Sequence, residues 1–184
     1  MLKAILNFLQ NIIERNRIIF SFVGGVSFIY FSKPTMIAIL IGTPLILLGE
    51  AIRTWASGFI NKNKDLAKEG PYAFTRNPLY LGNFFIGIGF SIMSNNLIIL
   101  YLFVKVFTIV YVITIKNEEK YLLSKFGDAF LEYKNKVPVF FPVKMTQSNF
   151  SLNFDWQLVK KHREHHTRLG VAGCITIFVL KAAY

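Results

Sequence analysis

The side chains best suited to chemistry lie in one short polar stretch, Gly70 to Gly82, which reads GPYAFTRNPLYLG. Its two prolines fix their own φ near roughly −65° and bias the residue before each toward extended backbone, so the stretch is stiff. It carries a guanidinium from Arg76, an amide from Asn77 and phenols from Tyr72 and Tyr80. Recognition chemistry is therefore concentrated in a rigid turn between two very apolar segments.

A pair of adjacent carboxylates, Glu118 and Glu119, follows another apolar segment. Neighbouring residues on a helix point about 100° apart, so one of the two can face a pocket while the other faces solvent or a basic neighbour. A carboxylate in a pocket suits a cationic ligand group such as an ammonium or a sulfonium. The alternative is that both are solvated charges at the end of a helix.

Arg53 is the third candidate, and it follows Glu50 by three residues, which places the two on nearly the same helix face. Ionisable residues at membrane depth are candidates for function. The alternative is that Arg53 extends its guanidinium to the membrane rim.

Metal chemistry is not expected. The three histidines, His162, His165 and His166, lie in the run KKHREHH, whose positive charge opposes a divalent cation and suits anionic lipid headgroups. The single cysteine, Cys174, lies in an apolar tail without metal-ligand spacing and excludes an intrachain disulfide.

Composition indicates a membrane protein of one domain. The 184 residues are 53% hydrophobic, with a formal net charge of +11. The mean hydropathy is +0.44, above that of soluble globular chains. A basic chain can also bind nucleic acid. That partner is not expected here, because the basic residues flank hydrophobic segments and form no soluble basic face.

The apolar segments predict an all-α, polytopic transmembrane helix bundle with amphipathic helices on the cytoplasmic side. Residues 1–17 have apolar positions at helical spacing and predict an amphipathic helix in the interface. Within the core, 18–115, we expect four spans, over 18–31, 35–60, 78–93 and 97–115. Residues 116–168 form a cytoplasmic segment, in which Gly127 ends or bends a helix. The apolar tail, 169–184, either completes the bundle as a fifth span or docks on the surface.

Charge sorting predicts which side of the membrane each loop faces. Lysine and arginine are dense before the first span, in the loop after the second and from Lys116 to Arg168, whereas the opposite loops hold only Lys33. By the positive-inside rule, the N-terminus, the Gly70 to Gly82 stretch and the Glu118–Glu119 pair all face the cytoplasm. The two polar candidates should therefore converge on one face.

Several of these stretches together resemble the integral-membrane methyltransferases of the isoprenylcysteine carboxyl methyltransferase and phospholipid methyltransferase type. The family's motif Gly-Pro-Tyr…Arg-His-Pro-x-Tyr-x-Gly reads here Gly70-Pro71-Tyr72…Arg76-Asn77-Pro78-Leu79-Tyr80-Leu81-Gly82. The Glu118-Glu119 pair, with Phe126-Gly127, Tyr133 and Pro138 after it, resembles the C-terminal signature. The segment Gly49-Glu50-x-x-Arg53-x-Trp55-Ala56 resembles one found in bacterial members. Asn77 stands where His is usual, which argues against a titrating role there.

The resemblance implies S-adenosylmethionine as cofactor and a lipid-like or small-molecule methyl acceptor, which would enter laterally from the bilayer. It places cofactor binding at Tyr72, Arg76, Asn77, Tyr80, Gly82, Glu118 and Glu119, and catalytic roles at Arg53 and Glu119. It also implies an integral protein of the bacterial inner membrane that is surrounded by membrane lipids. The acceptor's identity and the oligomeric state stay open.

Two other functions remain open at this point. A membrane reductase with a nicotinamide cofactor has a similar Arg-His-Pro-x-Tyr loop, but a phosphorylated dinucleotide needs cations where Glu118 and Glu119 stand. A non-catalytic membrane adaptor could use the basic surface to bind anionic lipid.

Overall fold

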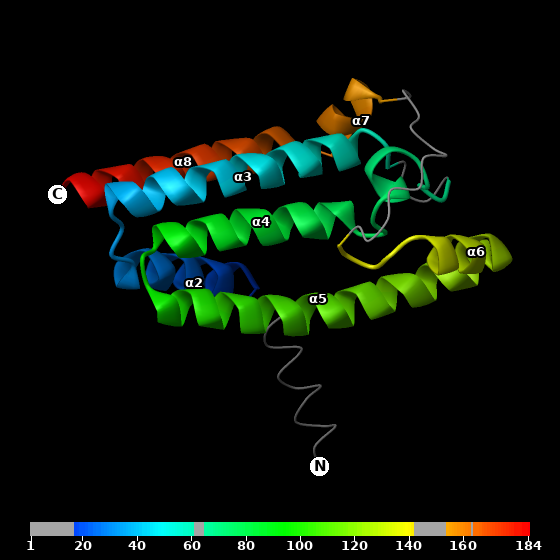
Figure 1. The fold of residues 1–184 in the computed structure, drawn as a ribbon, viewed down its shortest axis with the longest axis horizontal. Helices are drawn as coiled ribbons and strands as arrows, with labels where there is room; N and C mark the ends of the chain where they lie inside the picture. The colour runs from blue at the N-terminus through cyan, green and yellow to red at the C-terminus, as the bar shows by residue number, and fades with distance from the viewer. Residues whose placement is uncertain (1–16, 61–64, 142–153, 163) are drawn as a thin grey trace, which may run out of the picture.

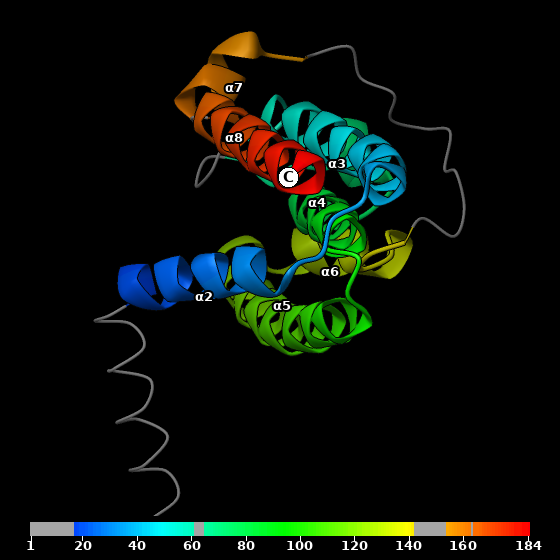
Figure 2. The ribbon, with the colours of Figure 1, turned by 90° about the vertical axis from the view of Figure 1, so that its left-hand side faces the viewer.

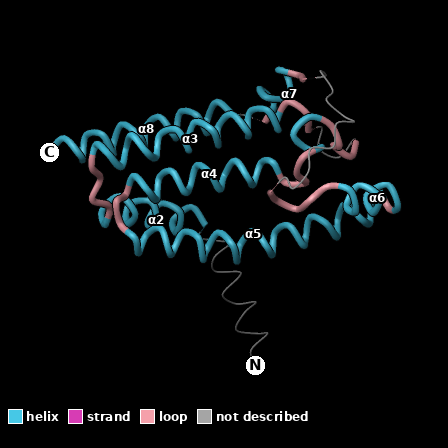
Figure 3. The backbone as a smooth tube through the Cα atoms, viewed as in Figure 1, coloured by secondary structure: helices cyan, strands magenta, loops and turns pink. Residues whose placement is uncertain are grey.

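The computed structural model describes residues 17–60, 65–141, 154–162 and 164–184, and throughout these ranges the regular structure is helical. The elements are α2 (Arg17–Phe31), α3 (Met36–Ser57), the 3-10 helix η1 (Gly70–Ala73), α4 (Pro78–Met93), α5 (Leu97–Phe126), α6 (Asp128–Lys136), α7 (Trp156–Lys161) and α8 (Glu164–Ala183). Helix α3 packs on α4 and α8, and α4 also contacts α5. Figures 1 and 3 show these four helices running lengthwise together, with η1, α6 and α7 gathered at one end. The expected all-α bundle is confirmed.

Three helices in the described ranges are long and apolar enough to cross a membrane: α3, α5 and α8. Helix α4 is apolar but has only 16 residues. At about 1.5 Å per residue it extends roughly 24 Å, short of the ~30 Å hydrocarbon layer. Helix α2 has 15 residues. Two of the four expected spans, 35–60 and 97–115, thus correspond to helices of spanning length, and the tail belongs to a third. The amphipathic helix expected over 1–17 lies, except for Arg17, outside the described residues.

The expected end of the fourth span at residue 115 is not an end of the helix, because α5 continues without a break to Phe126. The residues after Ile115 are charged or polar but good helix formers, so polarity changes there while the backbone does not. The helix ends at Gly127, whose φ of +50° is favourable only for glycine. The predicted role of Gly127 is confirmed. Similarly, α8 begins at Glu164, five residues before the expected tail.

Glycines at two-turn spacing set the contact between α3 and α4. Gly42 and Gly49 on α3 face Gly89 and Gly82 on α4, and a Cβ on either α3 glycine would lie 2.5 Å from the carbonyl oxygen of its partner. Small residues let membrane helices approach closely when apolar burial cannot drive their association. The same contact brings the end of α3 close to the beginning of α4, where the polar stretch lies.

The C-terminal helix α8 completes the core at the opposite end of the bundle. Its Phe178 is 1% exposed and packs with Ile39, Ile46 and Met93. Nearby, the ammonium of Lys181 donates to the carbonyl oxygens of Tyr30 at 3.0 Å and Ser32 at 2.8 Å, and so satisfies carbonyls that the end of α2 leaves free. In the end-on view of Figure 2, α8 lies against α3, on the side away from α5.

Candidate functional site

The Gly70 to Gly82 stretch folds into η1 and a short turn that leads into α4, with Pro78 at the first helical turn. Gly70 has a φ of +57°, and a Cβ there would lie 2.7 Å from the ring of Phe59. Glycine is therefore required at this position for both its backbone and its space.

The backbone carbonyls of Pro138 and Val139, which follow α6, hold this turn in place through hydrogen bonds. The amide N–H of Arg76 donates to the Pro138 carbonyl at 2.9 Å. The Thr75 hydroxyl and the Asn77 side-chain amide both donate to the Val139 carbonyl, at 3.2 and 2.9 Å. The turn is thus fixed by residues more than sixty positions further along the chain.

Two buried phenols connect η1 to α6. The Tyr133 hydroxyl donates to the Tyr72 carbonyl at 2.7 Å. Burial raises the pKa of the Tyr72 phenol well above its ordinary value, and the nearby Tyr133 and Glu118 add to the rise. The Tyr72 hydroxyl therefore stays protonated at neutral pH, yet it has no hydrogen-bond partner among the described residues. It is a buried donor available to a ligand.

The acidic pair meets the turn through two different contacts. Glu118 accepts a hydrogen bond of 2.8 Å from the Tyr80 hydroxyl. Glu119 lies 3.0 Å from Nη1 of Arg76 and 2.7 Å from Nζ of Lys134. The contact between Arg76 and Glu119 is an ion pair by distance, without the alignment of a hydrogen bond. Nε of Arg76 is also buried, and it has no hydrogen-bond partner among the described residues. Arg76 thus keeps its Nε donor for a further acceptor.

Four of the predicted site residues line one polar cavity of about 200 Å³ at this end of the bundle. The wall contains a guanidinium, two carboxylates, an amide and phenols, surrounded by apolar side chains. It is formed by Ile60, Asp65, Leu66, Ala67, Tyr72, Arg76, Asn77, Glu118, Tyr121, Leu122, Phe126 and Tyr133. Arg76 and Glu118 therefore face the same space, as the charge sorting of the sequence required.

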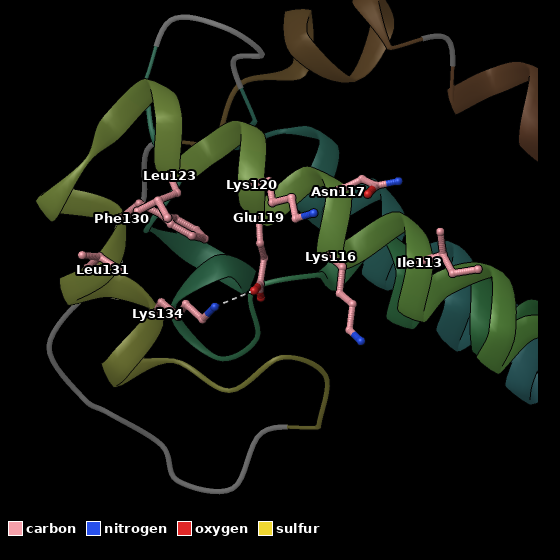
Figure 4. Close-up of a pocket in the computed structure, with 9 residues that line it drawn as sticks. All are labelled: Ile113, Lys116, Asn117, Glu119, Lys120, Leu123, Phe130, Leu131 and Lys134. Atoms are coloured by element: carbon pink, nitrogen blue, oxygen red, sulfur yellow. Dashed lines mark hydrogen bonds and ion pairs between the residues drawn. The ribbon is translucent and has the colours of Figure 1, made fainter. Parts of the chain in front are cut away.

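Glu119 lies on the other side of Arg76 and lines a separate cavity of about 360 Å³ between α5 and α6. Figure 4 shows Glu119 paired with Lys134, with Lys116 and Lys120 on the same helix as Glu119. The rest of the wall of this cavity is Asn117 and apolar side chains. Glu118 and Glu119 thus have different surroundings, as expected for adjacent positions of one helix.

A much larger apolar groove, of about 820 Å³, opens between α2, α4 and α5. Its wall is almost wholly aliphatic and aromatic, with Asn83 and Tyr111 as polar residues at the end nearest the turn. It is formed by Gly24, Ser27, Phe28, Phe31, Asn83, Ile99, Leu102, Phe103, Val106, Phe107, Val110 and Tyr111. Such a groove suits an alkyl or isoprenoid chain.

Tyr80 stands between the groove and the polar cavity. Its ring lies edge-on to that of Tyr111, with centroids 4.8 Å apart, while its hydroxyl contacts Glu118. Tyr111 lines the groove and Glu118 lines the polar cavity. The two spaces therefore meet at one pair of aromatic rings.

The remaining predicted residues, Arg53 and Gly82, lie at the α3–α4 contact outside the polar cavity. A Cβ on Gly82 would lie 2.6 Å from Cγ of Arg53, so this glycine has a packing role. The Arg53 guanidinium pairs with both carboxylate oxygens of Glu164, at 3.0 and 2.9 Å, and also donates to Asn83. Sequence reasoning missed Glu164, which lies in the histidine-rich run without any distinguishing signal. Asn83 could have been found as a lone amide in an apolar helix.

In the described ranges, no group of three or more histidine, cysteine or acidic side chains could hold a metal ion. This includes His162, His165 and His166. The rings of His165 and His166 lie tilted against each other, with centroids 4.2 Å apart.

The fold and the site define a class: a helical membrane protein in which a small polar cavity adjoins an apolar groove open toward lipid. The sequence model of the phospholipid methyltransferase family matches residues 36–129, just over half of the chain. The chain belongs to this family of membrane methyltransferases. The resemblance in the motif is thereby confirmed.

Individual relatives are similar to this chain over part of its length. A protein-S-isoprenylcysteine O-methyltransferase of Saccharomyces cerevisiae is 34% identical over 124 residues, which cover 61% of this chain and 52% of that protein. The corresponding enzyme of Schizosaccharomyces pombe is 36% identical over 83 residues, 45% of this chain and 35% of that protein. A cobalt-zinc-cadmium resistance protein of Cupriavidus metallidurans is 32% identical over 105 residues, 56% of this chain and 47% of that protein. The chain spans about half the length, or less, of these curated relatives.

Proposed function

We propose that this protein transfers a methyl group from S-adenosylmethionine to a lipid-like or membrane-accessible small acceptor. The observation that carries the proposal is a pair of buried donors without hydrogen-bond partners on residues that line one cavity: Nε of Arg76 and the Tyr72 hydroxyl. Buried polar groups are nearly always hydrogen-bonded, so donors without partners indicate a ligand rich in acceptors. Glu118 adds an acceptor for a cationic group.

The chemistry of these side chains fits the amino-acid part of S-adenosylmethionine, which carries a carboxylate, an ammonium and a sulfonium. Arg76 would bind the carboxylate through the N–H groups of its guanidinium, one of which already lies against Glu119. Glu118, oriented by Tyr80, would face the ammonium or the sulfonium. The side-chain oxygen of Asn77 stays available as an acceptor, because its nitrogen is used by Val139. At about 200 Å³ the cavity is smaller than a typical ligand site, so whole-cofactor binding requires its walls to separate.

When bound, S-adenosylmethionine supplies an electrophilic methyl carbon, whose bond to sulfur breaks as a lone pair of the acceptor attacks it. The residues described here would align the two partners and exclude water. The apolar groove would hold the acceptor's chain, and Tyr80 with Tyr111 marks the place where the two spaces meet. Alignment of this kind can contribute about 7–11 kcal/mol to lowering a barrier.

Calorimetric titration of the purified protein with S-adenosylmethionine tests the proposal. Replacing Arg76 by Ala or Glu118 by Gln removes a charged hydrogen-bonding group, and we expect each to weaken binding about 10- to 100-fold. Lys136→Gln is the matched control, since its partner is the exposed Glu132 and neither lines the cavity. Binding of a nicotinamide cofactor instead would favour the reductase. Binding of neither cofactor, with retention of anionic vesicles, would favour the adaptor.

We further propose that the polar end of the bundle faces the cytoplasm, on the positive-inside argument. A Lys136→Cys variant in a Cys174→Ser background should react with a membrane-impermeant thiol reagent only after the cells are opened. Labelling in intact cells would reverse the orientation.

A further inference from the structure

Four side chains from four helices form one hydrogen-bonded chain that ends in the apolar groove. Glu164 of α8 accepts from Arg53 of α3 at 3.0 and 2.9 Å. Arg53 donates through Nη1 to Oδ1 of Asn83 on α4. The Asn83 amide nitrogen donates to the Tyr111 hydroxyl oxygen of α5 at 3.0 Å. Asn83 and Tyr111 line the groove, whereas Arg53 and Glu164 lie behind it.

The chemistry of the first two members fixes the direction of the whole chain. A carboxylate can only accept hydrogen bonds and a guanidinium can only donate them. Asn83 must therefore present its oxygen to Arg53 and its nitrogen to Tyr111. Because that nitrogen carries only donors, the Tyr111 oxygen accepts, and its own proton has no acceptor in the described part of the chain. Both groups at the end of the groove consequently face it as donors.

The ion pair between Arg53 and Glu164 carries no net charge of its own. The Arg53 and Glu164 side chains are 14% and 5% exposed and neutralise each other, so their pair adds no free cation to the groove. Glu164 lies outside residues 36–129, which the family model matches. Its buried carboxylate holds the guanidinium, which in turn orients the amide. A neutral or mobile group at position 164 would leave Asn83 free to rotate.

We infer that Glu164 and Arg53 are positioning residues whose chain through Asn83 makes Tyr111 a hydrogen-bond donor, so that the groove selects alkyl compounds ending in an oxygen acceptor. A carboxylate, a phosphoester or a carbonyl would be bound in preference to an ammonium, which carries donors only. The inference rests on the proposed function in taking the groove as the acceptor's entrance. What the inference itself predicts is a difference in binding affinity between two kinds of headgroup.

Two probes with the same chain and opposite hydrogen-bonding character test it: dodecanoate and dodecylammonium, at pH 8.5, where both are charged. Each unlabelled probe competes with radiolabelled dodecanoate for the protein in lipid nanodiscs. The radiolabel retained by protein-free nanodiscs is subtracted as background. We expect dodecanoate to bind at least about tenfold more tightly, the difference that one hydrogen bond to a charged group supplies. Absence of saturable dodecanoate binding, or equal binding of both probes, would refute the inference. A preference for dodecylammonium would assign the headgroup to Glu118, beyond Tyr80.

Variants separate positioning from stability. Tyr111→Phe deletes the donor and keeps the ring, so the preference should vanish. Tyr101→Phe removes a phenol from the same helix outside the groove and should change nothing. Glu164→Gln should lower the preference, and Glu164→Asp, which keeps the carboxylate, should restore most of it. A purely structural Glu164 would instead lower the thermal midpoint without altering the preference.

Cofactor calorimetry on the same preparations distinguishes the two proposals. If S-adenosylmethionine binds but dodecanoate shows no preference, the donor chain is refuted and the proposed function stands. If the headgroup preference is found without any binding of S-adenosylmethionine, the groove inference stands and methyl transfer is refuted.

Discussion

Replacing Gly49 by Ala should separate α3 from α4 and disturb the site through packing alone. A Cβ at this position would lie 2.5 Å from the Gly82 carbonyl oxygen and 2.9 Å from the backbone nitrogen of Ile86. Both are backbone atoms, so no side-chain rotation can relieve the overlap. Ordinary van der Waals contact begins near 3.4 Å, and the helices must therefore move apart locally by 0.9 Å, the difference between 3.4 and 2.5 Å.

Overpacking of this kind typically destabilises a protein by about 1–3 kcal/mol. Here the displacement also acts on function, because Arg53 lies one turn beyond Gly49 and Asn83 directly follows Gly82. A shift of this size lengthens and weakens the hydrogen bond between Arg53 and Asn83. We therefore expect a loss of stability together with a loss of the headgroup preference of the groove.

The assay is the free energy of unfolding in mixed micelles of a mild detergent and sodium dodecyl sulfate, followed by circular dichroism. Gly173→Ala on α8 is the matched control, because a Cβ there has no atom within 4 Å. Alanine is the better helix former by about 1 kcal/mol, so the control should be neutral or stabilising. Equal stabilities for Gly49→Ala and Gly173→Ala would refute the packing argument.

Three further outcomes are expected. Glu164→Leu leaves the buried Arg53 without its partner and should lower the free energy of unfolding by about 3–5 kcal/mol. The double variant Arg53→Met, Glu164→Leu should recover part of this loss. A double variant that loses as much stability as the two single variants together would contradict the pairing. Tyr133→Phe removes the hydrogen bond to the Tyr72 carbonyl and should cost about 1–3 kcal/mol, measured by the same assay with Tyr30→Phe as an exposed control. Burial raises the pKa of both Tyr72 and Tyr133, so the folded chain holds these protons more tightly than the unfolded chain does. Stability should therefore be full below about pH 10 and fall above it, and a pH profile equally steep in Tyr133→Phe would argue against this origin.

The convergence of the polar turn and the acidic helix could be predicted because charge sorting constrains which loops share a membrane face. Arg76 and Glu118 are 42 positions apart, yet the positive-inside rule and the short Ser94–Asn96 connection predict that they lie on one side. The roles of these residues remain predictions. Arg76 and Glu118 share a cavity because the order and direction of the apolar helices bring them together. Patterns of hydropathy and charge predict this order and direction.

The interaction between Arg53 and Glu164 could not be predicted in the same way. It joins residues 111 positions apart through the docking of α8 on α3, and the sequence around Glu164 is dominated by basic residues and histidines. Hydropathy also could not predict where the helix of the fourth span ends, because it reports polarity rather than backbone continuity. Only Gly127 marks the true end of α5.

The backbone at Pro138 and Val139 has a consequence for how fragments of this protein would behave. A chain cut at residue 129 would contain the whole region that the family model matches, including the complete turn and both glutamates. It would lack the two carbonyl groups that accept from Thr75, Arg76 and Asn77. The smallest working unit of this fold is therefore longer than its most recognisable stretch of sequence, because the carbonyls that orient the signature belong to residues outside it.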